Sequence, residues 1–242
     1  MNSEPGPVAP PVADRPPRGE ADDRPQHLPY QLARQELARI LEAVGLGETY
    51  TVAPLGMVVG DMAQALTRGD DLLAQAQEPG DPQLDLARHM VNVAIFAMKI
   101  GQGVGCSDDE LPWLGLAACL HDVGMVTVPR PILEKLGPLT PKEMVLVRRH
   151  PENGFRILQK LGPEFEGLAN VGLQEHERED GSGYPRGLAG DQIQENAKIV
   201  GLADVYEALS HHRPYRPMSS PVDVVKKLIT AERRLFSARI LK

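Results

Sequence analysis

The pair His121–Asp122 closes an apolar run of the sequence and is followed by Gly124. An imidazole beside a carboxylate can coordinate one divalent metal ion, or the two groups can contact a pair of ions. Residues of the same chemical kind lie upstream and downstream, at His89, His150, Glu175, His176 and Asp204. Because protein metal sites collect such ligands from several elements, this set predicts a metal centre wherever the fold brings its members together.

Each of these residues also has an ordinary structural explanation. A lone histidine at a helix end is more often a cap or a surface residue. Asp85 lies four residues before His89 and shares its helix face, so both can reach one metal cluster, but the helix dipole also favours an aspartate near a helix N-terminus. Asp204 lies among apolar neighbours, where an ionised carboxylate is costly unless it meets a cation. The metal interpretation is favoured because four of the seven histidines fall near predicted helices or helix ends.

Helical periodicity dominates the sequence that must position these residues. The predicted helices cover about residues 30–45, 57–66, 84–100, 107–122, 140–150, 151–161, 163–177, 195–210 and 220 onward. Ser107 with Glu110, and Thr140 with Glu143, have the spacing of capping boxes that start a helix. The glycine-rich segment 179–190 is predicted to be a loop, and no alternating strand pattern exceeds four residues. The predicted fold class is all-α, a helical bundle.

The composition sets wider limits. The 242 residues are 42% hydrophobic but only 4% aromatic, which suits an aliphatic core of packed helices. Residues 1–28 contain seven prolines and are predicted to be a disordered tail, followed by an N-terminal helical region at 29–80 and a main domain at 81–242. The net charge of −7 argues against a nucleic-acid polymer as partner. With no apolar run of about 18 residues and no signal-peptide pattern, a cytoplasmic protein without membrane contact is expected.

Several motifs, in order, resemble the HD-GYP domain, a subgroup of the HD superfamily of metal-dependent phosphohydrolases. They are His-Asp-x-Gly at 121–124, His-Pro-x-x-Gly at 150–154, His-Glu-x-x-Asp-Gly-x-Gly-Tyr-Pro at 176–185, Ala-Asp at 203–204 and Arg-x-Tyr-Arg at 213–216. The resemblance covers roughly residues 84–242. It implies a helical bundle around two or three divalent ions, usually iron or manganese. It also implies hydrolysis of the bacterial second messenger cyclic di-GMP to the linear dinucleotide pGpG or to GMP.

The same resemblance implies a role for each matching residue. The shared HD metal site corresponds to His89, His121, Asp122 and Asp204, with His121 and Asp122 at the catalytic centre. Asp122 is expected to bridge to a second metal held by His150 and His176. Asp85 occupies the place at which members with three metals present a glutamate. The substrate phosphates are expected near Gly183, Tyr184, Pro185, Arg213 and Arg216.

Two residues depart from the family pattern. Met125 stands where the family usually has a lysine that supplies positive charge near the scissile phosphate. Glu175 stands where the family usually has a histidine, and its carboxylate can still bind a metal but adds negative charge. Two alternatives therefore stay open: a non-catalytic relative that binds nucleotide or a protein partner, and an HD phosphohydrolase that acts on another nucleotide. A homodimer or a signalling-protein partner is compatible with each interpretation.

Overall fold

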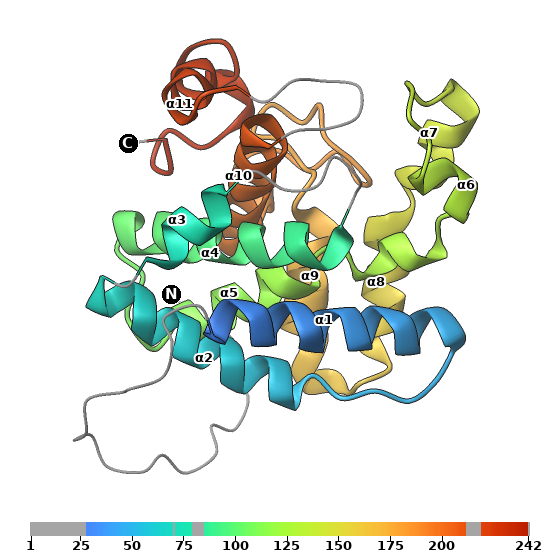
Figure 1. The fold of residues 1–242 in the computed structure, drawn as a ribbon. Coiled ribbons are helices and arrows are strands. Elements are labelled where there is room, and N and C mark those ends of the chain that lie inside the picture. Colours follow the sequence, from blue (N-terminus) through green and yellow to red (C-terminus); the bar gives the residue numbers. More distant parts are fainter. Residues whose placement is uncertain (1–27, 70, 79–84, 212–218, 242) are drawn as a thin grey trace, which may run out of the picture.

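The computed structural model describes residues 28–69, 71–78, 85–211 and 219–241, and this part of the chain forms helices and loops without a β-strand (Figure 1). The α-helices are, in chain order, α1 (Leu28–Leu46), α2 (Ala53–Arg68), α3 (Leu72–Gln77), α4 (Leu86–Val104), α5 (Leu111–Leu120), α6 (Arg130–Leu133), α7 (Pro141–Val147), α8 (His150–Gln159), α9 (Glu166–Gln174), α10 (Glu195–Ser210) and α11 (Pro221–Thr230). Short 3-10 helices are η1 (Val123–Thr127), η2 (Pro163–Phe165), η3 (Gly190–Gln192) and η4 (Arg233–Leu235). The predicted all-α fold class is confirmed. The tail predicted at 1–28 lies outside the described residues, except for its last position.

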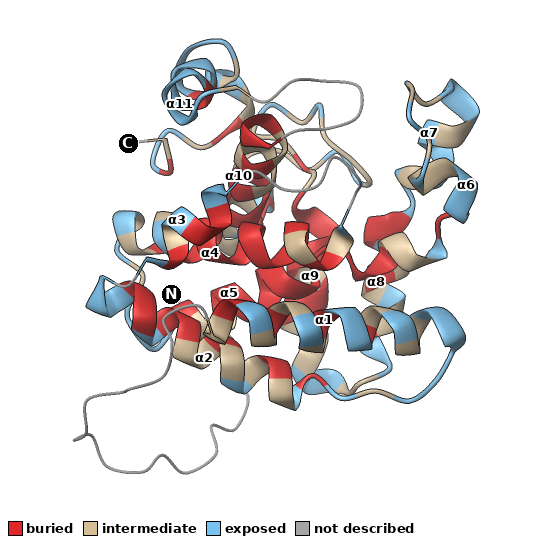
Figure 2. Cartoon of the chain, viewed as in Figure 1, coloured by how far each residue is buried: buried red, intermediate tan, exposed pale blue. Residues whose placement is uncertain are grey.

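The core is built around α4 and α5, which pack against each other and are buried along most of their length (Figure 2). α5 buries eight of its ten residues and has no polar side, while α4 is buried almost continuously from Ala87 to Met98. A helix that is apolar all round belongs in the interior. His89 on α4 and His121 directly after α5 are therefore carried deep into the protein.

The N-terminal helices α1 to α3 pack against the two central helices, with α1 and α3 contacting α4 and α2 contacting α5 (Figure 1). The inward face of α1 consists of Tyr30, Ala33, Leu37 and Ile40, at spacings of three or four residues. This face belongs to the same buried cluster as α4 and α5. α3 lies between the predicted helices at 57–66 and 84–100, where no helix was predicted, and it forms because Leu72 and Ala76 are buried in that cluster. The boundary between 29–80 and 81–242 stays a prediction.

Two predicted helix boundaries near the site are corrected by the structure. α5 begins at Leu111 rather than after Ser107, because residues 107–110 form a turn in which the Leu111 amide donates to the Ser107 carbonyl at 3.2 Å. Only half of this capping box forms, with Glu110 accepting from the Ser107 amide at 2.8 Å. His150 begins α8 instead of ending α7, because Pro151 has no N–H and fits the first turn of a new helix.

Other local predictions are confirmed. The capping box of Thr140 and Glu143 starts α7, with the Glu143 amide donating to Thr140 Oγ1 at 3.3 Å and the Thr140 amide donating to Glu143 at 2.6 Å. The glycine-rich segment 179–190 connects α9 to α10 as a loop, followed by η3. Among the described helices, none has both the length and the apolar character needed to cross a membrane.

Candidate metal centre

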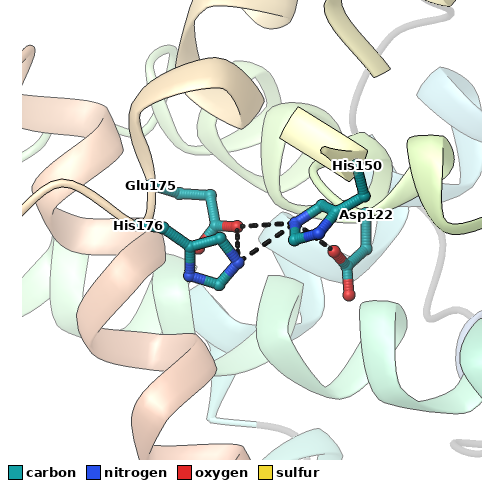
Figure 3. A group of neighbouring side chains, drawn as sticks. All are labelled: Asp122, His150, Glu175 and His176. Atoms are coloured by element: carbon teal, nitrogen blue, oxygen red, sulfur yellow. Dashed lines mark hydrogen bonds and ion pairs between the residues drawn. The ribbon is translucent and has the colours of Figure 1, made fainter. Parts of the chain in front are cut away.

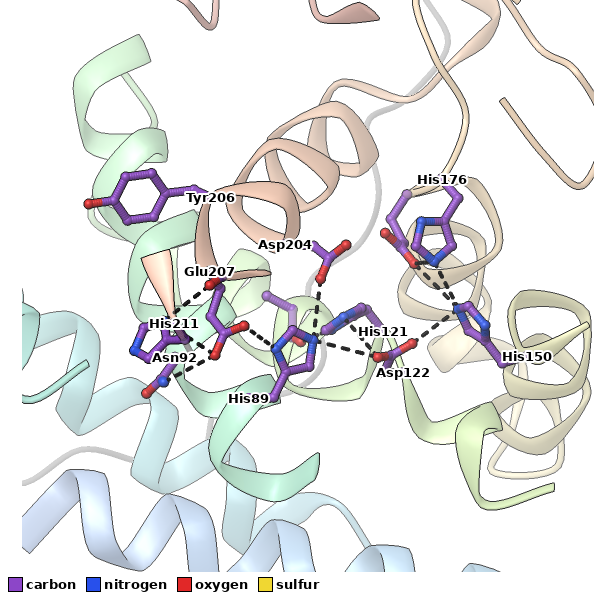
Figure 4. Close-up of polar contacts among 12 residues, drawn as sticks. His89, Asn92, His121, Asp122, His150, His176, Asp204, Tyr206, Glu207 and His211 are labelled. Atoms are coloured by element: carbon purple, nitrogen blue, oxygen red, sulfur yellow. Dashed lines mark hydrogen bonds and ion pairs between the residues drawn. The ribbon is translucent and has the colours of Figure 1, made fainter. Parts of the chain in front are cut away.

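Seven of the predicted ligands gather into two adjacent clusters. One cluster consists of Asp122, His150, Glu175 and His176 (Figure 3), and the other of His89, His121 and Asp204 (Figure 4). Within each cluster, every residue offers one ligand atom, and these atoms lie within 4.8 Å of one another. The ligands come from α4, the end of α5, the start of α8, the end of α9 and the middle of α10. The fold thus brings together residues that are up to 115 positions apart.

Asp122 connects the two clusters. Its Oδ2 atom lies 3.6 Å from Nε2 of His89 and 3.6 Å from Nε2 of His121. Its Oδ1 atom lies 3.1 Å from Nε2 of His150 in the other cluster. One carboxylate oxygen therefore faces each group of ligands, which is the arrangement that a bridging carboxylate requires.

Three histidines are held with the same ring nitrogen toward the ligand clusters. His121 and His150 each place Nδ1 against a backbone carbonyl, of Ala118 at 2.7 Å and of Val147 at 2.8 Å. A carbonyl oxygen only accepts, so both Nδ1 atoms carry a proton, and in the neutral ring the lone pair is on Nε2. His89 does the same through the carboxylate of Glu207, at 2.7 Å. These contacts fix the tautomer that a metal-binding imidazole needs.

Several buried ligand atoms have unsatisfied bonding capacity. Nε2 of His121 is buried without a hydrogen bond among the described residues, and the buried Glu175 carboxylate faces imidazole nitrogens, with Oε1 2.8 Å from Nε2 of His176 and 3.6 Å from Nε2 of His150. Nε2 of His150 and Nε2 of His176 approach to 3.0 Å, although neither can donate to the other without a proton between them. Orphaned buried acceptors are costly, and a cation placed among them satisfies them together. The nitrogen and carboxylate donors fit divalent metals of intermediate hardness.

The charges of the clusters shift the pKa values of their members. Burial alone would raise the pKa of Asp122, but the imidazoles of His121 and His150 outweigh it and hold that pKa well below its usual range. Burial opposes charge on His150 as well, yet Asp122 and Glu175 outweigh it and raise the pKa of His150 to about 9. Without a metal, protons on the imidazoles therefore balance the buried carboxylates. A metal ion takes the place of such protons when it binds.

Two glycines permit the close packing of the elements that carry the ligands. A Cβ atom on Gly124, two residues after Asp122, would lie 2.0 Å from the carbonyl oxygen of His150. A Cβ atom on Gly201, in α10, would lie 2.2 Å from the carbonyl oxygen of Glu175. Real contacts are never this short, so a larger residue would push the ligand-bearing backbones apart. The glycine of the His-Asp-x-Gly motif thus has a direct physical reason.

The predicted substrate loop lies against the second cluster through one side chain. The ring of Tyr184 stacks on that of His176, with centroids 4.6 Å apart and an interplanar angle of 23°. Gly183 packs on the backbone of residues 176–178, and buried Glu177 accepts from the amides of Arg186 and Leu188 at 2.7 and 2.9 Å. Pro185 follows Tyr184 through a cis peptide bond. Arg213 and Arg216 lie outside the described residues.

Asp85 belongs to neither cluster. Its Oδ1 atom accepts from the Arg88 amide at 2.9 Å and caps the N-terminus of α4. Its Oδ2 atom pairs with Arg34 on α1 at 2.6 Å. This is the structural alternative that the sequence left open for Asp85. A third metal at this residue stays a prediction.

Sequence analysis did not single out two residues that the structure brings to the site. The sequence could have identified Glu207 as a site residue, because it follows Asp204 by three positions and shares its face of α10. No sequence pattern identifies Arg148, because its position at the site depends on the fold of the loop 179–190. Its guanidinium lies 5.0 Å from the ring centroid of Tyr184 in that loop. Met125 lies half-buried in η1.

Comparison with known proteins agrees with this geometry. The family model of the HD domain matches residues 70–239. The chain is 31% identical over 232 residues to a cyclic di-GMP phosphodiesterase of Pseudomonas aeruginosa, PA4108, covering 92% of this chain and 54% of that protein. It is 40% identical over 152 residues to 3'3'-cGAMP-specific phosphodiesterase 3 of Vibrio cholerae, covering 63% and 32%.

The fold is also shared with a solved structure. Bd1817, an HDG"Y"P protein from Bdellovibrio bacteriovorus, superposes with a TM-score of 0.71 at 18% identity, covering 89% of this chain and 69% of that one. The chain belongs to the HD-domain family, and its resemblance to the HD-GYP subgroup is confirmed. It spans about half the length, or less, of the curated relatives described above.

Proposed function

We propose that this protein is a metal-dependent phosphodiesterase that hydrolyses cyclic di-GMP to pGpG or GMP. The observation that carries the proposal is the position of Asp122, with one oxygen toward each of two clusters of nitrogen and carboxylate ligands. Two divalent ions held side by side are suited to phosphodiester hydrolysis, because they activate water and neutralise charge on the attacking and leaving oxygens. The names of the curated relatives support a cyclic dinucleotide as substrate.

The ligands divide naturally between two ions. His89, His121 and Asp204 would hold one, His150, Glu175 and His176 the other, and Asp122 would contact both. The Nε2 lone pairs are already aimed at these positions by the contacts of Nδ1. We propose iron or manganese, because both accept imidazole and carboxylate together. Cytoplasmic localisation, a homodimer and a signalling partner stay predictions.

The protein supplies its own groups for an anionic substrate. Tyr184 offers an aromatic face beside His176, and Arg148 adds a guanidinium on this ring. Arginine binds phosphate oxygens through its forked donors. Arg148 can therefore provide positive charge in a site where Met125 replaces the usual lysine. Arg213 and Arg216 are proposed as further phosphate contacts on the basis of the sequence resemblance alone.

A turnover assay tests the proposal directly. The purified chain, loaded anaerobically with Fe²⁺ or Mn²⁺, is expected to convert cyclic di-GMP to pGpG or GMP. Asp122→Ala should abolish this activity, by roughly a thousandfold or more, because it removes the group shared by both ions. Asp109→Asn, at an exposed turn, is the matched control and should stay fully active. Absence of both products with either metal would contradict the proposal.

The second candidate is a protein that binds the nucleotide without hydrolysing it. Met125 and Glu175 favour it, because one removes positive charge and the other adds negative charge at the centre. Calorimetric binding of cyclic di-GMP by protein that shows no turnover would support this alternative. Assaying 3'3'-cGAMP and linear nucleotides in parallel separates both candidates from an HD phosphohydrolase with another substrate.

A further inference from the structure

A chain of buried hydrogen bonds runs from the N-terminal helix α1 to the ligand His89. The hydroxyl of Tyr30 donates to Oδ1 of Asn92 at 2.8 Å. Nδ2 of Asn92 donates to Oε1 of Glu207 at 3.5 Å. Oε2 of Glu207 accepts from Nδ1 of His89 at 2.7 Å. The four residues come from α1, α4 and α10, so the chain joins three helices of distant sequence.

All four residues of this hydrogen-bond chain are shielded from water. The exposed fractions are 4% for Tyr30, 0% for Asn92, 4% for Glu207 and 6% for His89. In such surroundings a polar side chain without its partner is costly, so each hydrogen bond restricts the orientation of the next group. Figure 4 shows Glu207 between His89 on one side and Asn92 and His211 on the other. Nδ1 of His211 lies 3.6 Å from Oε1 of Glu207.

The direction of donation gives Tyr30 a defined effect. Because its hydroxyl donates to Oδ1 of Asn92, the amide nitrogen is turned toward Glu207. The opposite amide orientation would place an oxygen against the carboxylate, and the two acceptors would repel each other. The carboxylate, held at Oε1, presents Oε2 to His89 and keeps that imidazole in the tautomer with a free Nε2.

We propose that Tyr30, Asn92 and Glu207 are positioning residues for the metal bound at His89, His121 and Asp204. The N-terminal helix α1 is thereby part of the support of the metal centre, which gives a role to the region preceding the main domain. This inference rests on the proposed metal-dependent function. The effect is expected to be largest on the metal held by His89, where the hydrogen-bond chain ends, and Asp122, 3.6 Å from His89, connects that residue to the other cluster.

A metal titration tests the inference without using turnover. Metal-free full-length protein is titrated with Mn²⁺ and, anaerobically, with Fe²⁺, and free Mn²⁺ is followed by electron paramagnetic resonance. Asp204→Asn and Glu175→Gln identify which binding step belongs to which cluster. Glu207→Gln is expected to weaken the His89 step by about 10- to 100-fold. Tyr30→Phe, which removes one hydroxyl, is expected to weaken the same step by roughly threefold or more.

Tyr50→Phe provides the matched control. Its hydroxyl also lies in the N-terminal region and donates to a backbone carbonyl, that of Ile157, at 3.3 Å, but it leads to no ligand. Tyr50→Phe should leave both metal steps unchanged. A purely structural role for Tyr30 would weaken both steps equally or neither, and either result overturns the inference while leaving the proposed function intact. If the wild-type protein takes up neither metal, the inference and the proposed function fall together.

Discussion

The two ligand clusters differ in how firmly their side chains are held. In the cluster of His89, His121 and Asp204, both imidazoles donate from Nδ1 to an acceptor at 2.7 Å. In the other cluster, His150 is anchored in this way at 2.8 Å, whereas the Glu175 carboxylate pairs with imidazoles of its own cluster, its Oε1 lying 2.8 Å from Nε2 of His176 and 3.6 Å from Nε2 of His150. The first cluster is thus set before a metal arrives, and the second has more freedom to adapt.

This difference follows from the elements that carry the ligands. The His89 cluster is built on α4, α5 and α10, the helices of the buried core. The other cluster is built on the first residue of α8 and the residues just after α9, and it borders the loop 179–190. The departure from the family pattern at Glu175 falls in this second, more adaptable cluster. Glu175 is itself buried, so its carboxylate needs the cationic partners that the neighbouring imidazoles, or a metal ion, provide.

A change at Glu175 should produce the largest difference between the two clusters. Glu175→Gln keeps the shape of the side chain but removes its charge, and a neutral amide is a poor metal ligand. We expect the Mn²⁺ affinity of the second cluster to fall by roughly a hundredfold, or about 2.7 kcal/mol, while the His89 step changes little. Glu175→His should retain both steps and favour Fe²⁺ over Mn²⁺ relative to wild type.

The control for this series is Glu152→Gln, at an exposed position on α8. Calorimetric Mn²⁺ titration of the metal-free proteins measures each step. Should Glu175→Gln bind the second ion as tightly as wild type, the carboxylate would be a buried counter-ion for the histidines and not a metal ligand.

Gly124 tests the contact that aligns the two clusters. Gly124→Ala would place a methyl carbon against the His150 carbonyl and the Gly154 amide, both backbone atoms that cannot rotate away. We expect a loss of at least about 3 kcal/mol in the free energy of unfolding, and displacement of His150. Gly60→Ala, at a position in α2 where a Cβ meets nothing within 4 Å, should be neutral or stabilise slightly. Urea unfolding of both variants measures the difference, and equal stabilities would contradict the close approach.

The pH dependence of stability should reveal the charge balance of the metal-free centre. Asp122 and Glu175 outweigh burial and raise the pKa of His150 to about 9, so the folded protein holds this proton more tightly than the unfolded chain. The resulting stabilisation is complete below about pH 6.5 and is lost as the pH rises through 9. For metal-free protein we expect a loss of about 2 kcal/mol between pH 7 and 9.5. His150→Gln should lack this decrease, and an identical slope in both proteins would disprove the assignment.

The ligands could be predicted from the sequence because the evidence is local. The motifs at 121–124, 150–154 and 176–185 identify residue types and order, and apolar periodicity places them on helices. Asp85 shows the limit of such reasoning, since its distance from His89 suits both a ligand and a helix cap. The partner that decides between them, Arg34, lies 51 residues away on α1. The contacts of Tyr30 and Arg148 could not be predicted from the sequence for the same reason, because they are set by tertiary packing.

Arg148 provides the mildest test, directed at the open side of the second cluster. Its guanidinium is exposed and lies over Tyr184, so removing it should leave metal binding intact while weakening attraction for an anionic substrate. For Arg148→Met we expect KM for cyclic di-GMP to rise about three- to tenfold with kcat within twofold of wild type. Arg149→Met is the control, because this neighbouring residue is also an exposed arginine and makes no ring contact within the described part of the chain. Steady-state kinetics at two salt concentrations should show the effect shrinking at high salt. A fall in kcat with unchanged KM would instead mean that Arg148 acts on the transition state, and equal behaviour of the two variants would remove it from the site.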